Sequence, residues 1–392
     1  MIPTPLTADD SPLAPRARSL LADLQRQEHA KALVLPTDDP LDPKRRRRVE
    51  LTHDEMWAQP EAVRRTLANE RRAIAEVAAA CAKRSIERIV MVGCGDSLAC
   101  MLAVRAMYEE LLRVPCEPIQ ALDFNYYYAR TAGDRVLVVA LSSSGVTTRA
   151  VEALLLARAQ GALTLGVSNT PGSPVMTEAE MCLTVHAERK GWPTQASTAA
   201  MMVLYQLGLD LGRAMRGNSA RIDNLETALH RTPDSIAQVL ERHDAAVAAI
   251  AEKEAHRHIY LYSGGGPAYA CAQFGAAKVK ECATSHAIAI PLEEYHHYNS
   301  QKSGDPLFLI APRGPSLARA LDTALEGRRW GGQVYAVTTE GDPTLSGFVD
   351  EQLELPEMPE FLVPMVYTVP VQLFAYHTAI AKFRRAKESA GA

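Results

Sequence analysis

The 392-residue sequence contains no run of 18 apolar residues, the length of a membrane-spanning helix. Its first segment, MIPTPLTADDSP, has no apolar stretch of the kind found in export signals. The seven cysteines form no CxxC pair, and their odd number and scattered spacing do not suit a disulfide framework or a zinc site. These absences predict a cytoplasmic protein with reduced thiols and no membrane contact.

The sequence also lacks an excess of either charge, since its net charge is −4. It therefore has no general attraction to nucleic acid or anionic membranes. The exception is the basic run Lys44–Arg48. We expect this run to be a solvated linker or a subunit-contacting arm. DNA binding through it is a weaker alternative, because no helix-turn-helix pattern accompanies it.

The composition, with 47% hydrophobic and 22% charged residues, is that of a soluble globular protein, and the length suits two domains. Residues 1–50 are rich in proline, aspartate and arginine and are expected to form an N-terminal arm with one short helix near 18–32. A helix is expected to begin at Thr52, where Thr52 and Glu55 fit a capping box, and a second one near Pro60.

The segment from Arg135 to Val151 shows the clearest local signal. Val136–Leu141 is a continuous apolar run, typical of a parallel strand buried on both faces. The polar turn Ser142, Ser143, Ser144, Gly145 follows, and a helix is expected from about Thr147. Backbone N–H groups, hydroxyls and the positive end of a helix dipole then meet at one point, which favours a phosphate site. The alternative is that the serines only cap the helix.

Strands and helices alternate in two similar sets, each opening with a strand that ends in glycine, near Gly93 and Gly264. This order predicts an α/β protein with two tandem domains, each a parallel sheet flanked by helices in three layers. We expect the first domain at 51–216, a helical connection at 217–256 and the second domain at 257–392. The expected strands are 89–92, 136–141, 163–168, 182–186, 258–262, 286–291, 307–311, 334–338 and 352–355.

The second half supplies the ionisable groups. Lys278 and Glu281 lie three residues apart on a predicted helix, a spacing that also suits a solvated ion pair. His297, sixteen residues after Glu281, and the adjacent His296 follow Glu293 and Glu294. Histidine titrates in the range needed for proton transfer. Metal binding is the rival interpretation, but adjacent histidines lack the spacing of helical zinc ligands, so no metal is expected.

The serine turn resembles the phosphate loop of the sugar isomerase (SIS) family, Ser-x-Ser-Gly-x-Thr. Ser142, Ser144, Gly145 and Thr147 match it in order, whereas Ser143 stands where glutamine is common. Two related domains with one serine loop resemble the double-SIS proteins, which include the isomerase half of glutamine:fructose-6-phosphate aminotransferase and fructosamine-6-phosphate deglycases. The resemblance covers about residues 52–385 and implies flavodoxin-like domains.

The resemblance also implies roles for individual residues. Ser97, Ala196 and Ser197 match family positions that contact the phosphosugar, together with the serine loop. Glu281 would move a proton between C1 and C2, and Lys278 would orient it or contact the substrate. Glu294 and His297 match a Glu and a His of the family's catalytic run. His297 would assist ring opening or protonate a leaving amine, contributed by the neighbouring subunit of a homodimer.

The expected function is therefore that of a phosphosugar aldose–ketose isomerase, or of a deaminase or deglycase of amino-sugar phosphates. Its substrate would be a phosphorylated sugar or amino sugar, and acid–base chemistry of this kind needs no cofactor. The alternative is a non-catalytic sugar-phosphate sensor. One departure from the family pattern is that Tyr298-Asn299 replaces the Gly-Pro after the catalytic histidine, which indicates a rebuilt pocket near the reacting carbons.

Overall fold

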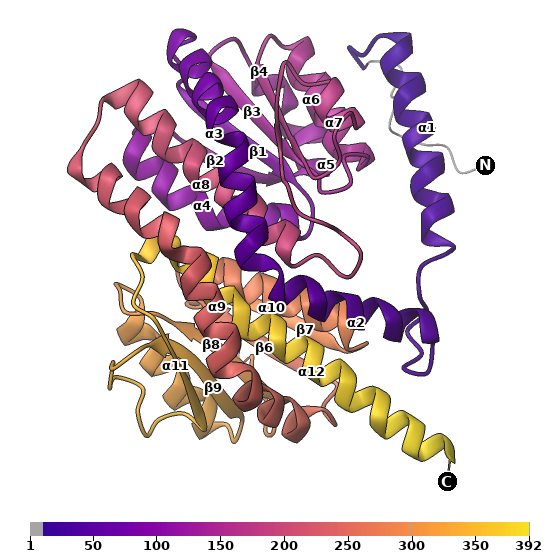
Figure 1. Ribbon diagram of the computed structural model, residues 1–392, viewed down its shortest axis with the longest axis vertical. Helices are drawn as coiled ribbons and strands as arrows, with labels where there is room; N and C mark the ends of the chain where they lie inside the picture. The colour runs from indigo at the N-terminus through magenta and orange to yellow at the C-terminus, as the bar shows by residue number, and fades with distance from the viewer. Residues whose placement is uncertain (1–10, 299, 392) are drawn as a thin grey trace.

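The computed structural model describes residues 11–298 and 300–391. It contains two five-stranded sheets, one above the other in Figure 1, with helices packed on both faces of each. Residues 1–10, for which we expected no export signal, lie outside the described residues. Within the described range, no helix is both long enough and apolar enough to cross a membrane.

The first sheet is entirely parallel and has the order β2-β1-β3-β4-β5. This is the 2-1-3-4-5 order of flavodoxin-like folds. Its strands are β1 (Arg88–Gly93), β2 (Cys116–Gln120), β3 (Val136–Leu141), β4 (Leu163–Ser168) and β5 (Met181–Thr184). Its helices and short turns are α4 (Asp96–Leu112), α5 (Ala121–Asp123), η2 (Phe124–Tyr128), η3 (Ala129–Thr131), α6 (Thr148–Ala159), α7 (Pro174–Thr177) and α8 (Gln195–Arg216).

The second sheet repeats this topology with the order β10-β9-β8-β6-β7, again all parallel. Its strands are β6 (Ile259–Gly264), β7 (His286–Pro291), β8 (Pro306–Ala311), β9 (Gln333–Thr339) and β10 (Glu351–Leu355). Its helices are α10 (Ala268–Cys282), η4 (Glu294–His296), α11 (Leu317–Arg329), η5 (Glu360–Leu362) and the C-terminal α12 (Val363–Gly391). The tandem α/β fold predicted from the sequence is therefore confirmed.

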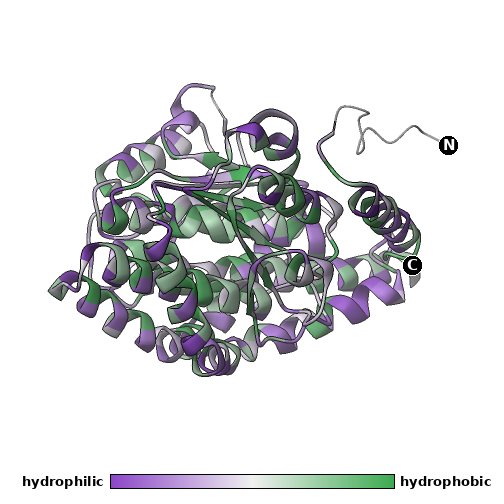
Figure 2. Ribbon diagram, turned by 90° about the horizontal axis from the view of Figure 1, so that it is seen from above, coloured by the Kyte–Doolittle hydropathy of each residue, from purple (hydrophilic) through white to green (hydrophobic). Residues whose placement is uncertain are grey.

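Alternate residues of the strands face different layers, as the two-residue period requires. In β1 and β3, Ile89 and Leu137 face a core that continues through α4, α8, α10 and α12 into the second sheet, where it includes Tyr260 and Phe308. Their neighbours in the chain, such as Val90, face a separate core under α6. Figure 2 shows the apolar strands between helices whose outer surfaces are polar. One hydrophobic core thus spans both sheets.

Four further helices join the two sheets or flank them. α3 (Gln59–Lys83) packs on α8 and α9 (Ala220–Glu254), and α9 also packs on α12. α2 (Pro43–Trp57) lies across the seam between the sheets and packs on α12. α1 (Pro15–Ala32) lies apart from this group at the edge of the first sheet, where Leu21 and Leu24 pack into the core under α6 (Figure 1).

The predicted capping box at Thr52 is wrong. The helix begins nine residues earlier, with Asp42 as the N-cap and Pro43 in its first turn, so Thr52 and Glu55 lie inside α2. Their side chains instead bind the backbone of the loop that joins β5 to α8. The expected start near Pro60 is confirmed, because α3 begins at Gln59 with that proline in its first turn.

Candidate functional site

A cavity of about 250 Å³ opens beyond the carboxyl ends of β1 and β3. β1 and β3 are neighbours in the sheet, and the strands that follow them in the chain lie on opposite sides of this pair. Open α/β sheets bind ligands at such a topological switch point. The cavity is bounded by both domains, since α10 of the second domain contributes Glu281. Its lining residues are Cys94, Gly95, Asp96, Ser97, Cys100, Leu141, Ser143, Ser144, Thr147, Asn169, Arg189, Pro193, Ala196, Ser197, Ala200 and Glu281.

Three helix N-termini meet at this cavity. Ser97 lies in the first turn of α4, Thr147 is the N-cap of α6, and Ala196 and Ser197 lie in the first turn of α8. The N-cap of α4 is Gly95, and neither Thr147 of α6 nor Thr194 of α8 accepts a hydrogen bond from its helix with its side chain. At α6 the first N–H group, that of Thr148, already donates a hydrogen bond to the Glu28 carboxylate. The first N–H groups of α4 and α8 and the helix dipoles place positive partial charge around one space, which favours an anion.

Ser142 and Gly145 shape the serine loop rather than line the cavity. Ser142 is buried, its Oγ accepts a hydrogen bond from the Gly145 N–H at 3.1 Å, and it lies 2.8 Å from the Thr147 Oγ1. Gly145 has φ of +67°, and a Cβ there would lie 1.9 Å from the Ser173 Oγ. The loop conformation thus requires glycine at this position.

Ser143 and Ser144 face the cavity. The Ser143 Oγ is buried and has no hydrogen-bond partner among the described residues. Buried hydroxyls are rarely left without a partner in native proteins, so this hydroxyl is available to a ligand. The serine that replaces the family's usual glutamine therefore contributes a donor to the same space.

A buried ionic network joins the first domain to the second at the floor of the cavity. The ammonium of Lys278, 1% exposed, lies 2.6 Å from the Asp96 carboxylate and also donates a hydrogen bond to Glu281. Asp96 also accepts a hydrogen bond from the Ser197 Oγ at 3.1 Å. The network fixes the carboxylate of Glu281 beside the loops of the first domain.

Burial raises the pKa of Glu281, although the cations of Lys278 and Arg48 oppose that shift, and the nearby Asp96 carboxylate adds to it. Burial alone would lower the pKa of Lys278, but the two carboxylates on either side outweigh it and raise that pKa. Lys278 therefore stays protonated and does not line the cavity, which does not suit a nucleophile. Glu281 has the raised pKa expected of a general base or acid.

The structure does not bring Glu294 or His297 into this cavity. His297 is 61% exposed and its Nε2 lies 3.6 Å from Glu293, and Glu294 is exposed as well. The preceding His296 points inward instead, with its Nδ1 at 2.6 Å from Glu326 and its Nε2 at 2.9 Å from Thr323. Within the described part of the chain, no three His, Cys, Asp or Glu side chains are grouped so as to hold a metal ion.

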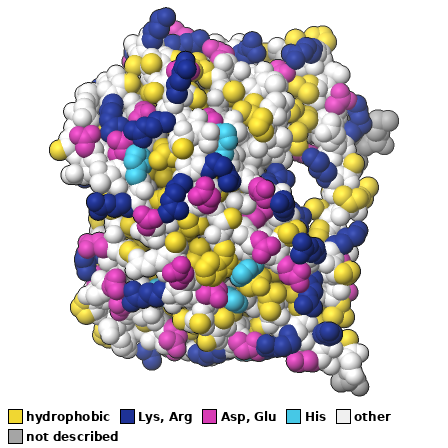
Figure 3. All heavy atoms as spheres, viewed as in Figure 1, with side chains coloured by type: hydrophobic (Ala, Val, Ile, Leu, Met, Phe, Trp, Pro, Cys, Tyr) yellow, Lys and Arg dark blue, Asp and Glu magenta, His cyan; other side chains and the backbone are white. Residues whose placement is uncertain are grey.

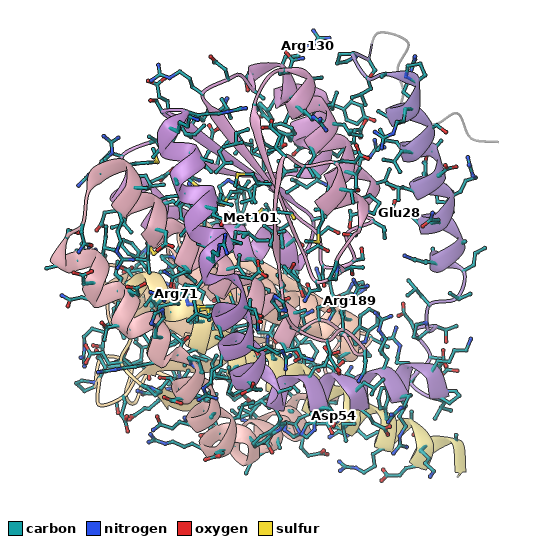
Figure 4. All side chains as sticks on the ribbon, turned by 45° about the horizontal axis from the view of Figure 1, so that its top comes forward. Glu28, Asp54, Arg71, Met101, Arg130 and Arg189 are labelled. Atoms are coloured by element: carbon teal, nitrogen blue, oxygen red, sulfur yellow. The ribbon has the colours of Figure 1, made fainter. Side chains whose placement is uncertain are left out.

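The sequence interpretation missed Asp96, Asn169 and Arg189, which all line the cavity. Asp96 stands directly before the predicted Ser97 and opens α4, so its place after a glycine-ended strand was a usable signal. Arg189 lies on the loop between β5 and α8, shown in Figure 4, and no local pattern marks it.

The family model of the SIS domain matches this chain twice, at residues 84–209 and 253–382. A glutamine–fructose-6-phosphate aminotransferase (isomerizing) of Thermus thermophilus is 32% identical over 335 residues, which are 83% of this chain and 55% of that protein. One from Chlorobaculum tepidum is 31% identical over 76% of this chain and 48% of its own length. The chain thus spans about half the length of these curated relatives.

Solved structures show the same fold. The C-terminal domain of glucosamine-fructose-6-phosphate aminotransferase from Francisella tularensis superposes with a TM-score of 0.76 at 23% identity, covering 84% of this chain and 96% of that one. Glucosamine-6-phosphate deaminase from Thermotoga maritima superposes with a TM-score of 0.65 at 19% identity, covering 84% and 94%. Because the two matches to the family model span most of both sheets, the chain belongs to the SIS family and carries two SIS domains.

Proposed function

We propose that this chain is an enzyme that moves protons between C1 and C2 of a phosphorylated sugar or amino sugar. The observation that carries the proposal is that one cavity is lined by hydroxyl residues at helix N-termini, by Ser143, whose Oγ has no partner among the described residues, and by Glu281, whose pKa is raised. The hydroxyl residues at the helix N-termini suit a phosphate, and the Glu281 carboxylate suits proton transfer.

The phosphate would bind to Ser97, Ser143, Ser144, Thr147 and the N-terminus of α8 around Ser197. Glu281 would then remove the proton from one of the two carbons, and the electron pair of that C–H bond would form an enediol or enolamine. Returning the proton to the neighbouring carbon completes the isomerisation. No electrons leave the substrate, so acid–base groups and oxyanion donors are sufficient for the reaction.

The names of the relatives support a sugar 6-phosphate as substrate. They are a fructose-6-phosphate aminotransferase, a glucosamine-6-phosphate deaminase and a tagatose-6-phosphate ketose/aldose isomerase, and all three names contain such a sugar. The reactions differ among them. Isomerisation, deamination and deglycation share the proton transfer that we assign to Glu281, so all three remain within the proposal.

The second acid–base group would come from a partner subunit. His297 and Glu294 lie outside the cavity of their own chain, on an exposed turn after β7. In a homodimer, that turn can complete the cavity of the other copy. Lys278 would act as a positioning residue that orients Glu281.

A thermal-shift panel tests the proposal. Sugar phosphates and amino-sugar phosphates are compared with their dephosphorylated forms, in the wild type and in Ser143→Ala and Ser144→Ala. A ligand that binds the native state raises the melting temperature by mass action. We expect at least one phosphosugar to stabilise the protein, and the shift to shrink in both variants.

An equal response to phosphorylated and dephosphorylated sugars would contradict the phosphate site. Turnover of the stabilising ligand is then measured in the wild type and in Glu281→Gln. Stabilisation without turnover would favour the alternative of a sugar-phosphate sensor, which the position of His297 outside the cavity also suits.

A further inference from the structure

The N-terminal arm lies outside both stretches that match the SIS model, yet it reaches the site. The Glu28 carboxylate of α1 accepts a hydrogen bond from the Thr148 N–H at 2.8 Å. Thr148 directly follows Thr147, which lines the cavity and is one of the residues to which we assign the phosphate. A carboxylate of the chain itself therefore occupies the positive end of α6, beside the phosphate position.

The charge of Glu28 also acts inside the cavity. Burial raises the pKa of the Cys94 thiol, and the Glu28 carboxylate adds to that shift. Cys94 directly follows β1 and lines the cavity. A phosphate bound there would face the negative charge of Glu28, and like charges at short range repel each other. The carboxylate and a bound phosphate therefore compete for one positive region.

The two halves of α1 are held in different ways. In the first half, Leu21 and Leu24 are buried in the core under α6, and Arg16 pairs with Glu178 at 2.9 Å. After Leu24 no residue of the helix is buried. Among the described residues, Glu28 makes the only hydrogen bond from this second half to the first domain. Its release would therefore free the second half without exposing a buried apolar side chain.

Residues 29–35, which we call the strap, follow Glu28 and are all exposed. Just beyond the strap, the Arg45 guanidinium donates hydrogen bonds to the backbone oxygens of Thr37 and Glu281, each at 2.6 Å. Figure 1 shows this part of the chain between α1 and α2, and Figure 3 shows an opening between it and the body of the molecule, at the right. The strap thus runs from the α6 side of the cavity to the Glu281 side and is free to move between these two contacts.

We propose that the arm is an internal competitor of the substrate phosphate: Glu28 holds the second half of α1 on the start of α6, and a bound phosphosugar releases it. This rests on the function proposed above and adds a regulatory step to it. A phosphosugar then binds only to those molecules in which the arm is open, so its apparent affinity is reduced by the closed fraction. The arm, as well as the cavity, sets the affinity of the site.

The first test compares two variants that each remove one negative charge from α1. In Glu28→Gln the amide oxygen can still accept the Thr148 N–H, so the charge is what changes. Asp23→Asn is the matched control, because Asp23 pairs with Arg26 of the same helix and not with the first domain. Dissociation constants of inorganic phosphate, fructose 6-phosphate and fructose are measured by titration calorimetry in both variants and in the wild type.

We expect Glu28→Gln to bind the two phosphate ligands about 10-fold more tightly than the wild type, because a hydrogen bond to a charged group is stronger than one to a neutral amide and keeps more molecules closed. Asp23→Asn should bind them as the wild type does, and neither variant should bind fructose more tightly. Equal or weaker binding of the phosphate ligands by Glu28→Gln would overturn the inference, since Glu28 would then be only a helix cap.

Hydrogen exchange of the backbone amides follows the arm itself. Fructose 6-phosphate should speed exchange in residues 25–32 of the wild type, fructose should not, and Glu28→Gln should exchange faster there without any ligand. If fructose 6-phosphate binds but exchange in this segment slows or stays the same, the inference is overturned and the proposed function stands. If neither phosphate ligand binds to any of the three proteins, the inference fails together with the phosphate site on which it rests.

Discussion

The carboxylate of Asp96 lies 2.6 Å from the ammonium of Lys278, and the two residues belong to different SIS domains. Asp96 opens α4 directly after β1, and Lys278 lies on α10 with 1% of its side chain exposed. This pair therefore sets the position of Glu281 relative to the serine loop. The geometry of the site depends on an ionic contact across the domain seam.

Replacing Asp96 should destabilise the fold. In Asp96→Ala, Lys278 keeps only Glu281 as a partner, and a buried ammonium that loses a partner costs about 3 kcal/mol of unfolding free energy. Chemical denaturation measures the change. The control is Asp54→Ala, because Asp54 is exposed on α2, and its loss should change stability by less than about 0.5 kcal/mol. Equal effects of the two substitutions would contradict the role of the pair.

Two glycines with positive φ should respond differently to alanine. Gly145 has φ of +67° and its Cβ would meet Ser173, whereas Gly95 has φ of +56° with nothing within 4 Å of its Cβ. Gly95 combines this φ with ψ of −128°, a backbone region nearly confined to glycine, so Gly95→Ala should cost about 2 kcal/mol from backbone strain alone. Gly145→Ala should cost clearly more and weaken phosphosugar binding. Thermal unfolding compares the two, and a smaller effect at Gly145 would be inconsistent with the loop geometry.

The pH dependence of the reaction should report Glu281. As a base it must be ionised, so kcat/KM should fall as the pH drops through its pKa, which burial raises above the usual glutamate value. Arg48 opposes this shift, so Arg48→Gln should raise the pKa of Glu281 further and move the acidic limb to higher pH. Lys280→Gln, an exposed change on the same helix, should leave the limb in place. A limb that does not move in Arg48→Gln would refute the assignment.

Mixed dimers test whether His297 acts across subunits. Glu281→Gln and His297→Ala homodimers should each be inactive. Mixing them should restore up to about a quarter of the wild-type activity, since random exchange gives half heterodimers and each has one intact site of two. Size-exclusion chromatography checks that both variants remain dimers. If no activity returns although subunit exchange is verified, either both residues act in the site of one chain or His297 takes no part in the reaction.

Much of the fold follows from local sequence patterns. Strands such as β3 and β8 are buried on both faces and appear as continuous apolar runs. The strand β2, with the sequence CEPIQ, was missed because it is a short edge strand with a proline and two polar side chains. The start of α2 was missed because Thr52 and Glu55, which look like a cap, bind a distant loop.

The serine loop and Glu281 were predicted because the carboxyl ends of parallel strands meet at one edge of a sheet and because the family motifs are local. Asp96 and Arg189 were not predicted, because contacts with residues far away in the sequence position them. Asp96 pairs with Lys278, 182 residues away, and Arg189 gains its place from α2 through backbone hydrogen bonds. Contacts of that range depend on the packing of the two domains and leave no periodic signal.

The N-terminal arm also reaches the start of α6, directly after the serine loop. The Glu28 carboxylate on α1 accepts a hydrogen bond from the Thr148 N–H at 2.8 Å, and its side chain extends towards the first domain in Figure 4. It therefore supplies the cap that Thr147 does not provide for α6.

The hydrophobic core that runs from Ile89 to Phe308 through α4, α8, α10 and α12 has a consequence for unfolding. Neither sheet can lose its helices without exposing the apolar face of the other. The two SIS domains are thus separate in the sequence but should unfold as one cooperative unit. Calorimetry should record one endotherm, whereas two independently unfolding domains would give two.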